Sequence, residues 1–146
     1  MEPRLDYYAA SPEAVTAILK LEAANFDFAI EKPLLELIKL RVSQINGCSF
    51  CTDLHATEAR KSGETERRLH ALPVWRDAPF FSARERAGLA WAESVTLVAQ
   101  THIPDDIYAL LCSEFSERER VDLTVAIATI NSWNRLAVSF RAQPTL

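Results

Sequence analysis

The chain has 146 residues, enough for one well-buried domain and few for two. A formal net charge of -4 and a pI near 5.4 argue against a nucleic-acid partner, and no apolar run approaches the ~18 residues of a membrane span. Only three glycines are present, which excludes a Gly-rich phosphate loop, whereas the helix formers Ala, Leu, Glu and Arg are plentiful. The composition predicts an all-α protein.

The N-terminus, MEPRLDYYAASPEAV, has no basic segment followed by an apolar core. We therefore expect no secretory signal and a cytoplasmic location. In that compartment a Cys-x-x-Cys pair is more often catalytic or metal-binding than a structural disulfide. The cysteine count is three, so at least one thiol has no partner within the chain.

Capping residues mark where helices begin and end along the chain. Ser11 precedes Pro12 as a helix start, and Gly47 fits a helix stop because glycine adopts the left-handed cap without a Cβ penalty. Ser82 and Ser116 each stand three residues before a glutamate, which is the pattern of a capping box. The predicted helices begin at Pro12 and then run from about Leu34 to Ile45, Ser49 to Lys61, Glu64 to Ala71, Ser82 to Val98, Pro104 to Phe115 and Ser116 to Phe140.

These segments leave no repeat, low-complexity tract or flexible linker between them. We expect a single domain spanning residues 1–146, folded as an all-α bundle of about six to eight helices.

The stretch NGCSFCTDLH places two cysteines and a histidine at a helix start. A helix that begins near Cys48 brings backbone N–H groups and the positive end of the helix dipole to the thiols, which favours the thiolate. His55 lies one turn beyond Cys51 and could accept its proton, while Cys48 is close enough to form a disulfide with Cys51. A nucleophile, a base and a second thiol are therefore expected within about one and a half turns.

Two kinds of redox chemistry fit this arrangement. A thiolate can attack the O–O bond of a peroxide and become a sulfenic acid, which the neighbouring thiol converts to a disulfide. An external dithiol would then restore the pair by exchange. The same residues could instead perform disulfide exchange without any peroxide.

Other interpretations of the motif fit less well. A c-type haem site needs histidine directly after the second cysteine, where Thr52 stands, and a thioredoxin-like site needs a βαβ context. Zinc would take Cys48, Cys51 and His55 as ligands, with Glu36 or a distant residue as the fourth. No second Cys or His pair typical of zinc modules follows, so redox chemistry is favoured over metal binding.

Periodicity alone gives no role to two other candidate residues. At 100° per residue Glu36 shares a stripe with Lys32, Lys39 and Ser43, which is typical of a solvated face. Cys112 lies in the apolar run IYALLC, and we interpret it as a core thiol. The polar run NSWNR near the end of the chain predicts an interhelical or intersubunit hydrogen-bond cluster.

Glu36 followed by Cys48-x-x-Cys51-x-x-x-His55, with Asn46-Gly47 before the pair, resembles the AhpD-like alkylhydroperoxidase core of the carboxymuconolactone decarboxylase family. The resemblance extends through LHALPVWRDAPFFSARERAGLAWAESVT and ATINSWNRLAV, from about residue 30 to residue 140. By this resemblance Cys51 matches the peroxidatic cysteine, Cys48 its resolving partner, and His55 and Glu36 the proton relay. Phe50 stands where the best-known members have a second histidine.

The resemblance further implies an all-helical thiol-dependent hydroperoxide reductase that forms trimers or hexamers. It implies no bound cofactor, with reduction by a dithiol or a lipoyl-type protein. The decarboxylase branch usually lacks the cysteine pair, so the pair favours the redox branch. A non-enzymatic redox sensor or disulfide-exchange module, a zinc-stabilised interaction domain and a decarboxylase of small cyclic acids remain as alternatives.

Overall fold

The computed structural model describes residues 2–144, which form α-helices, two short 3₁₀ helices and connecting turns without any strand. The α-helices are α1 (Tyr7–Ala10), α2 (Pro12–Ala24), α3 (Lys32–Ile45), α4 (Ser49–Lys61), α5 (Glu66–Ala71), α6 (Ala83–Thr96), α7 (Val98–Thr101), α8 (Asp105–Glu114) and α9 (Glu117–Phe140). The 3₁₀ helices are η1 (Asn25–Asp27) and η2 (Leu72–Val74). The predicted all-α fold is confirmed.

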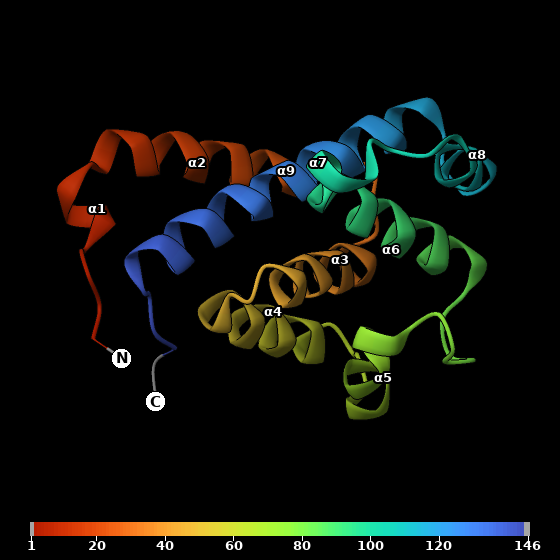
Figure 1. Cartoon of the computed structure of the whole chain (residues 1–146), viewed down its shortest axis with the longest axis horizontal. Coiled ribbons are helices and arrows are strands. Elements are labelled where there is room, and N and C mark those ends of the chain that lie inside the picture. Colours follow the sequence, from red (N-terminus) through yellow and green to blue (C-terminus); the bar gives the residue numbers. More distant parts are fainter. Residues whose placement is uncertain (1, 145–146) are drawn as a thin grey trace.

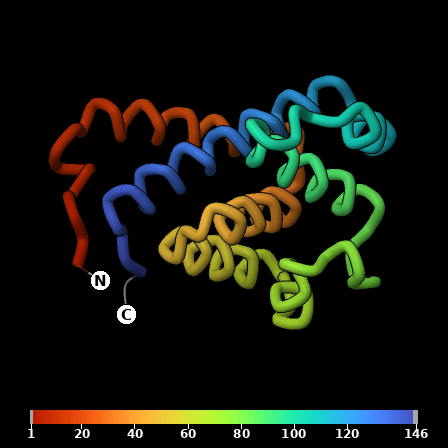
Figure 2. The backbone as a smooth tube through the Cα atoms, viewed as in Figure 1, coloured from red at the N-terminus to blue at the C-terminus, as the bar shows by residue number. Residues whose placement is uncertain are grey.

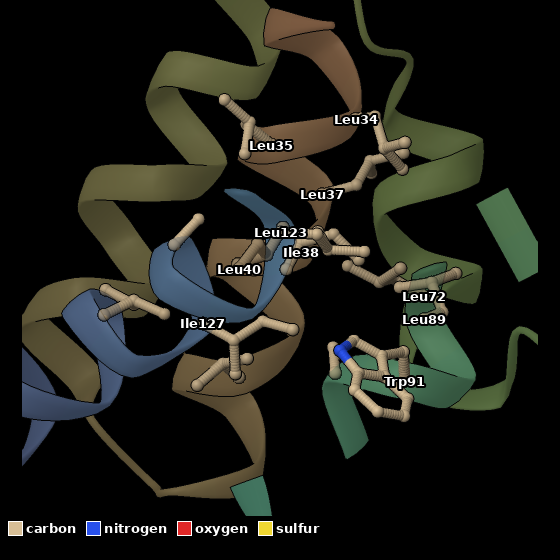
Figure 3. Close-up of a cluster of buried hydrophobic side chains, with 14 of the residues drawn as sticks. Leu34, Leu35, Leu37, Ile38, Leu40, Leu72, Leu89, Trp91, Leu123 and Ile127 are labelled. Atoms are coloured by element: carbon tan, nitrogen blue, oxygen red, sulfur yellow. The ribbon is translucent and has the colours of Figure 1, made fainter. Parts of the chain in front are cut away.

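Helix α3 lies at the centre of the bundle, between α4 and α9 and against α6 (Figure 1). Nine of the fourteen residues in its sequence KPLLELIKLRVSQI are buried, which fits a helix that neighbours surround on several sides. Figure 3 shows its apolar side chains directed at those of neighbouring helices. The cluster includes Leu37, Ile38 and Leu40 of α3, Leu89 of α6, and Leu123 and Ile127 of α9, all at most 1% exposed.

Local capping determines where the two longer C-terminal helices begin. Ser82 and Ser116 each accept a hydrogen bond from the backbone N–H three residues on, and the glutamate there bonds back to the serine N–H. Both predicted capping boxes are thus formed, and each satisfies two backbone donors at a helix start. Figure 2 shows the N-terminal segment beside the end of α9. The backbone N–H of Arg4 donates to the Phe140 carbonyl at 2.9 Å.

The seven predicted helices correspond to all of the α-helices except α1 and α7, which are single turns. Asp6 caps α1 by accepting from the N–H groups of Tyr8 and Ala9, and this signal was not used in the prediction. The helix expected to reach Val98 instead ends at Thr96, and α7 follows before a turn in which His102 and Ile103 have positive φ. Within residues 2–144 no helix is long and apolar enough to cross a membrane.

Candidate active site

The cysteine pair lies at a tight turn between two packed helices. Gly47 has φ +66°, and the N–H groups of Gly47 and Cys48 donate to the carbonyls of Gln44 and Ser43. These bonds form a Schellman end to α3, as the Asn46-Gly47 pair predicts. Cys48 follows at once as the N-cap of α4, so the end of one helix fixes the first residue of the next.

Cys48 caps α4 through its sulfur. Its Sγ accepts the backbone N–H of Cys51 at 3.2 Å, the role that a serine or aspartate oxygen usually has at this position. Both cysteines are free thiols, and their exposed fractions are only 2% for Cys48 and 3% for Cys51. No disulfide joins the two sulfurs in this structure, and both are shielded from bulk solvent.

Hydrogen bonding makes the two thiols electrostatically different. The pKa of the Cys48 thiol falls from 9.0 to about 7, mainly because its sulfur accepts a hydrogen bond from the Cys51 thiol. Burial raises this pKa, but hydrogen bonds from the Cys51 backbone and the Asn134 amide lower it further. The pKa of the Cys51 thiol is raised, because it donates to Cys48, is buried and lies beside the Cys48 charge. Of the two thiols, Cys48 therefore has the lower pKa, because the Cys51 thiol and backbone N–H groups donate to its sulfur.

His55 and Glu36 join α4 to α3. His55 Nδ1 lies 2.9 Å from Glu36 Oε2, and both side chains are buried. A carboxylate accepts hydrogen bonds, so Nδ1 carries the proton in this pair and leaves Nε2 as the basic nitrogen. This arrangement orients the imidazole one helical turn beyond Cys51.

The solvated position expected for Glu36 from periodicity is wrong. Glu36, Lys39 and Ser43 are all buried, and only Lys32 of that stripe is exposed. The stripe faces neighbouring helices, where each polar group finds a partner: Lys39 forms an ion pair with Glu22 of α2, and Ser43 Oγ donates to the Lys39 carbonyl at 2.8 Å. Partners on other helices stabilise a polar stripe that a single helix would expose.

A cavity of about 220 Å³ opens beside Cys51 and His55, and we call it the inner cavity. Its walls are mainly apolar, and they include the carboxylate side chain of Glu22. The aromatic residues of the wall are Tyr7, Tyr8, Phe50 and Trp133. Burial, followed by the nearby Tyr8 and cysteine charges, raises the pKa of Tyr7 to about 12, so its hydroxyl stays protonated near neutral pH.

Cys48 does not line the inner cavity. It instead lines a groove of about 320 Å³ between the start of α4 and the end of α9, which we call the outer groove and which also contacts Val138, Arg141 and Gln143. A shallower depression toward Thr52 and Asp53 also reaches Cys48. The two sulfurs thus border different spaces although they belong to one motif.

The polar run NSWNR forms the predicted interhelical hydrogen-bond cluster. Asn46 Nδ2 donates to the side-chain oxygens of Asn131 and Asn134 at 3.0 and 2.9 Å, and Asn134 Nδ2 donates to Ser43 Oγ at 3.1 Å. Sequence reasoning gave Asn134 no part in the site. It shares a helical face with Ile127, Ile130 and Ala137, and an amide on an apolar stripe was a signal of burial.

Neither Cys112 nor a metal-binding cluster belongs to this site in the described residues. Cys112, expected in the core, is half-buried on α8, where Arg120 Nη1 lies 3.1 Å from its sulfur. Among residues 2–144 no group of three or more His, Cys, Asp or Glu side chains is arranged to hold a metal ion.

Comparison with known proteins agrees with the fold and the sequence pattern. YdfG, an uncharacterized protein of Bacillus subtilis strain 168, is 40% identical over 139 residues, which make up 95% of each chain. A protein of unknown function from Agrobacterium tumefaciens, suggested to be the antioxidant defence protein AhpD, has a solved structure that is 44% identical and matches with a TM-score of 0.97 over 99% of both chains. The debrominase Bmp8 has the same fold, with a TM-score of 0.81 at 20% identity over 94% of this chain and 74% of its own.

The fold alone does not determine the reaction, since one architecture supports several chemistries. The sequence model of the carboxymuconolactone decarboxylase family matches residues 9–94, a range that includes α2 to α5 and most of α6 and therefore the whole Glu36–His55 segment. The chain belongs to the carboxymuconolactone decarboxylase family and has the AhpD-like all-α fold.

Proposed function

We propose that the protein is a thiol-dependent hydroperoxide reductase in which Cys51 reacts with the peroxide. The observation that supports this most directly is the inner cavity, where the Cys51 sulfur and the His55 imidazole border the same apolar space. The AhpD-type description of the Agrobacterium protein supports the same reaction class. Cys48 cannot replace Cys51 in this role without a rearrangement, because it does not line that cavity.

The proposed reaction begins with a proton leaving the Cys51 thiol. The Cys48 thiolate and His55 Nε2 are the two acceptors available, and Glu36 stabilises the imidazolium that forms in the second case. The Cys51 thiolate attacks the distal peroxide oxygen, so an S–O bond forms and the O–O bond breaks. The departing alkoxide takes back the proton that left Cys51, from Cys48 or from His55 Nε2, and leaves as an alcohol.

The second half of the reaction closes the disulfide. The Cys48 thiolate attacks the Cys51 sulfenic acid, the S–S bond forms, and hydroxide leaves as water after protonation. A dithiol must then supply two electrons to restore the pair. The low pKa of Cys48 favours this step, because its thiolate is present near neutral pH.

Substitution of Cys51 by serine tests the proposal, with substitution of Cys112 by serine as the matched control. Consumption of an alkyl hydroperoxide would be followed in the presence of excess dithiothreitol. We expect Cys51→Ser to abolish turnover and Cys112→Ser to retain it, because Cys112 lies on α8, away from the pair. Full activity in Cys51→Ser would end the proposal, and oxidation without turnover in the wild-type protein would favour a redox sensor.

We propose in addition that the chain assembles as a homo-oligomer, with the trimer or hexamer expected from the family resemblance. The N-terminal segment supports this, because it exposes several large apolar side chains in succession: Leu5, Tyr8, Leu19, Leu21 and Phe26, the last of them 80% exposed. Such a concentration is typical of an interaction surface. Light scattering coupled to size-exclusion chromatography would measure the mass, and a monomer of 16.4 kDa would refute assembly.

A further inference from the structure

The two sulfurs of the pair border separate spaces, and this separation has a consequence for the catalytic cycle. The inner cavity contacts Cys51 but not Cys48, and the outer groove contacts Cys48 but not Cys51. Ala137 of α9 lines both and forms part of the wall between them. A molecule in one space therefore meets one sulfur only.

We propose that the reductant reaches the oxidised pair through the outer groove and attacks Cys48, on the opposite side from the peroxide. This inference rests on the proposed function. Displacement at sulfur requires the attacking, central and leaving sulfurs to lie in line, so a thiolate that attacks Cys48 approaches from the side away from Cys51. The outer groove lies against Cys48 and not against Cys51, which is the position that such an approach requires.

The shape of the groove indicates the kind of reductant. Cys48 is 2% exposed and borders a space of about 320 Å³, so a dithiol on the flat surface of a folded protein meets little of its sulfur. A slender aliphatic dithiol, free or at the end of a flexible arm, fits a space of this size. The side chains that border the groove include the aliphatic Val138, the amide of Gln143 and the guanidinium of Arg141, which suit an aliphatic chain without positive charge.

Reduction proceeds in two exchange steps. The first thiol of the reductant loses its proton to solvent and forms a bond to Cys48 Sγ, the Cys48–Cys51 bond breaks, and Cys51 leaves with the electron pair and takes a proton from solvent. The second thiol of the reductant loses its proton to solvent and attacks its own sulfur in the mixed disulfide. The reductant leaves as a cyclic disulfide and Cys48 is released as a thiolate, so two electrons pass from the dithiol to the pair.

The two spaces offer a matched pair of substitutions. Val138 borders the outer groove with 46% of its side chain exposed, and Leu54 borders the inner cavity with 44% exposed. Because both side chains are partly in solvent, a tryptophan at either position can fill the neighbouring space without entering the core. Gln143→Trp is a second substitution at the outer groove, at an exposed position, in case Val138→Trp does not fold.

The two half-reactions would be measured separately. Reduced protein is mixed with cumene hydroperoxide, or oxidised protein with dithiothreitol, and samples are quenched with N-ethylmaleimide and analysed by mass spectrometry. We expect Val138→Trp to slow reduction by about tenfold and to leave oxidation unchanged, because exchange rates depend on access to the attacked sulfur. Leu54→Trp is expected to slow oxidation and to leave reduction unchanged.

Two outcomes are distinguishable. If the wild-type protein turns over but both outer-groove variants are reduced as fast as wild type, or Leu54→Trp slows both half-reactions, the reductant uses the inner cavity and the inference is wrong. If the wild-type pair is not oxidised by the hydroperoxide at all, the proposed function itself fails.

Discussion

The unequal acidity of the two thiols can be tested by removing each in turn. A fall in the pKa of Cys48 from 9.0 to about 7 corresponds to roughly 3 kcal/mol in favour of its thiolate. At pH 7 about half of the Cys48 side chains are then ionised, compared with about 1% for an ordinary thiol of pKa 9.0. The structure attributes the largest part of this change to the Cys51 thiol that donates to Cys48.

Thiolate absorbance at 240 nm, measured against pH on the reduced protein, provides the assay. A Cys112→Ser background leaves only the pair to titrate. The pair should show one thiolate that forms near pH 7, and Cys48→Ala should eliminate it. Cys51→Ala should shift it to higher pH, because the donated hydrogen bond is lost while the backbone N–H bonds to the Cys48 sulfur remain.

The opposite result would refute the reasoning. If Cys48→Ala retains a thiolate that forms near pH 7, then Cys51 is acidic without its partner, and His55 rather than the cap at Cys48 controls its proton. Circular dichroism of both alanine variants would establish that α4 is still formed, so that a changed titration reflects the thiols and not unfolding.

Two further predictions concern stability. Unfolding of the reduced protein by urea should require more denaturant as the pH rises from 7 to 9, because the unfolded chain binds a proton at Cys48 that the folded chain has released. The free energy of unfolding should rise by at most about 3 kcal/mol. Above pH 9 the stability should fall again, because Cys51, whose pKa is raised, keeps its proton in the folded chain but loses it in the unfolded chain. Stability that falls between pH 7 and 9 would contradict the lowered pKa of Cys48. Gly88→Ala should stabilise the protein by about 1 kcal/mol, because glycine is unfavourable inside a helix. A Cβ there would lie 3.4 Å from Ile38 Cδ1 and 3.5 Å from Phe115 Cζ, and a lower urea midpoint would show that these side chains cannot adjust.

The sequence predicted the helix boundaries that depend on residues close together in the chain. The starts at Ser82 and Ser116 and the stop at Gly47 follow from capping groups within three residues, so they were read correctly from the chain. The all-α fold followed from composition and these boundaries. The one-turn helices α1 and α7 were missed because they lack an apolar periodicity, and α1 is held partly by contacts with α2.

The site was predictable only in part, because its properties depend on contacts between distant segments. The spacing of Cys48, Cys51 and His55 follows from one helix, and the family resemblance added Glu36, but the roles of these four residues stay predictions. The burial of Glu36 results from α4 packing against α3, which periodicity within a single helix cannot reveal. The acidity of Cys48 depends on a cap geometry and on Asn134, 86 positions along the chain from it.

The sulfur cap on α4 links the oxidation state of the pair to the order of a helix end. A thiolate is a stronger hydrogen-bond acceptor than a neutral disulfide sulfur, so formation of the Cys48–Cys51 bond weakens the bond from the Cys51 N–H at the same moment. Loss of an N-cap typically costs about 1 kcal/mol. The first turn of α4 is therefore expected to fray in the oxidised protein and to tighten again on reduction, so that its amide hydrogens would exchange faster with solvent in one half of the cycle than in the other.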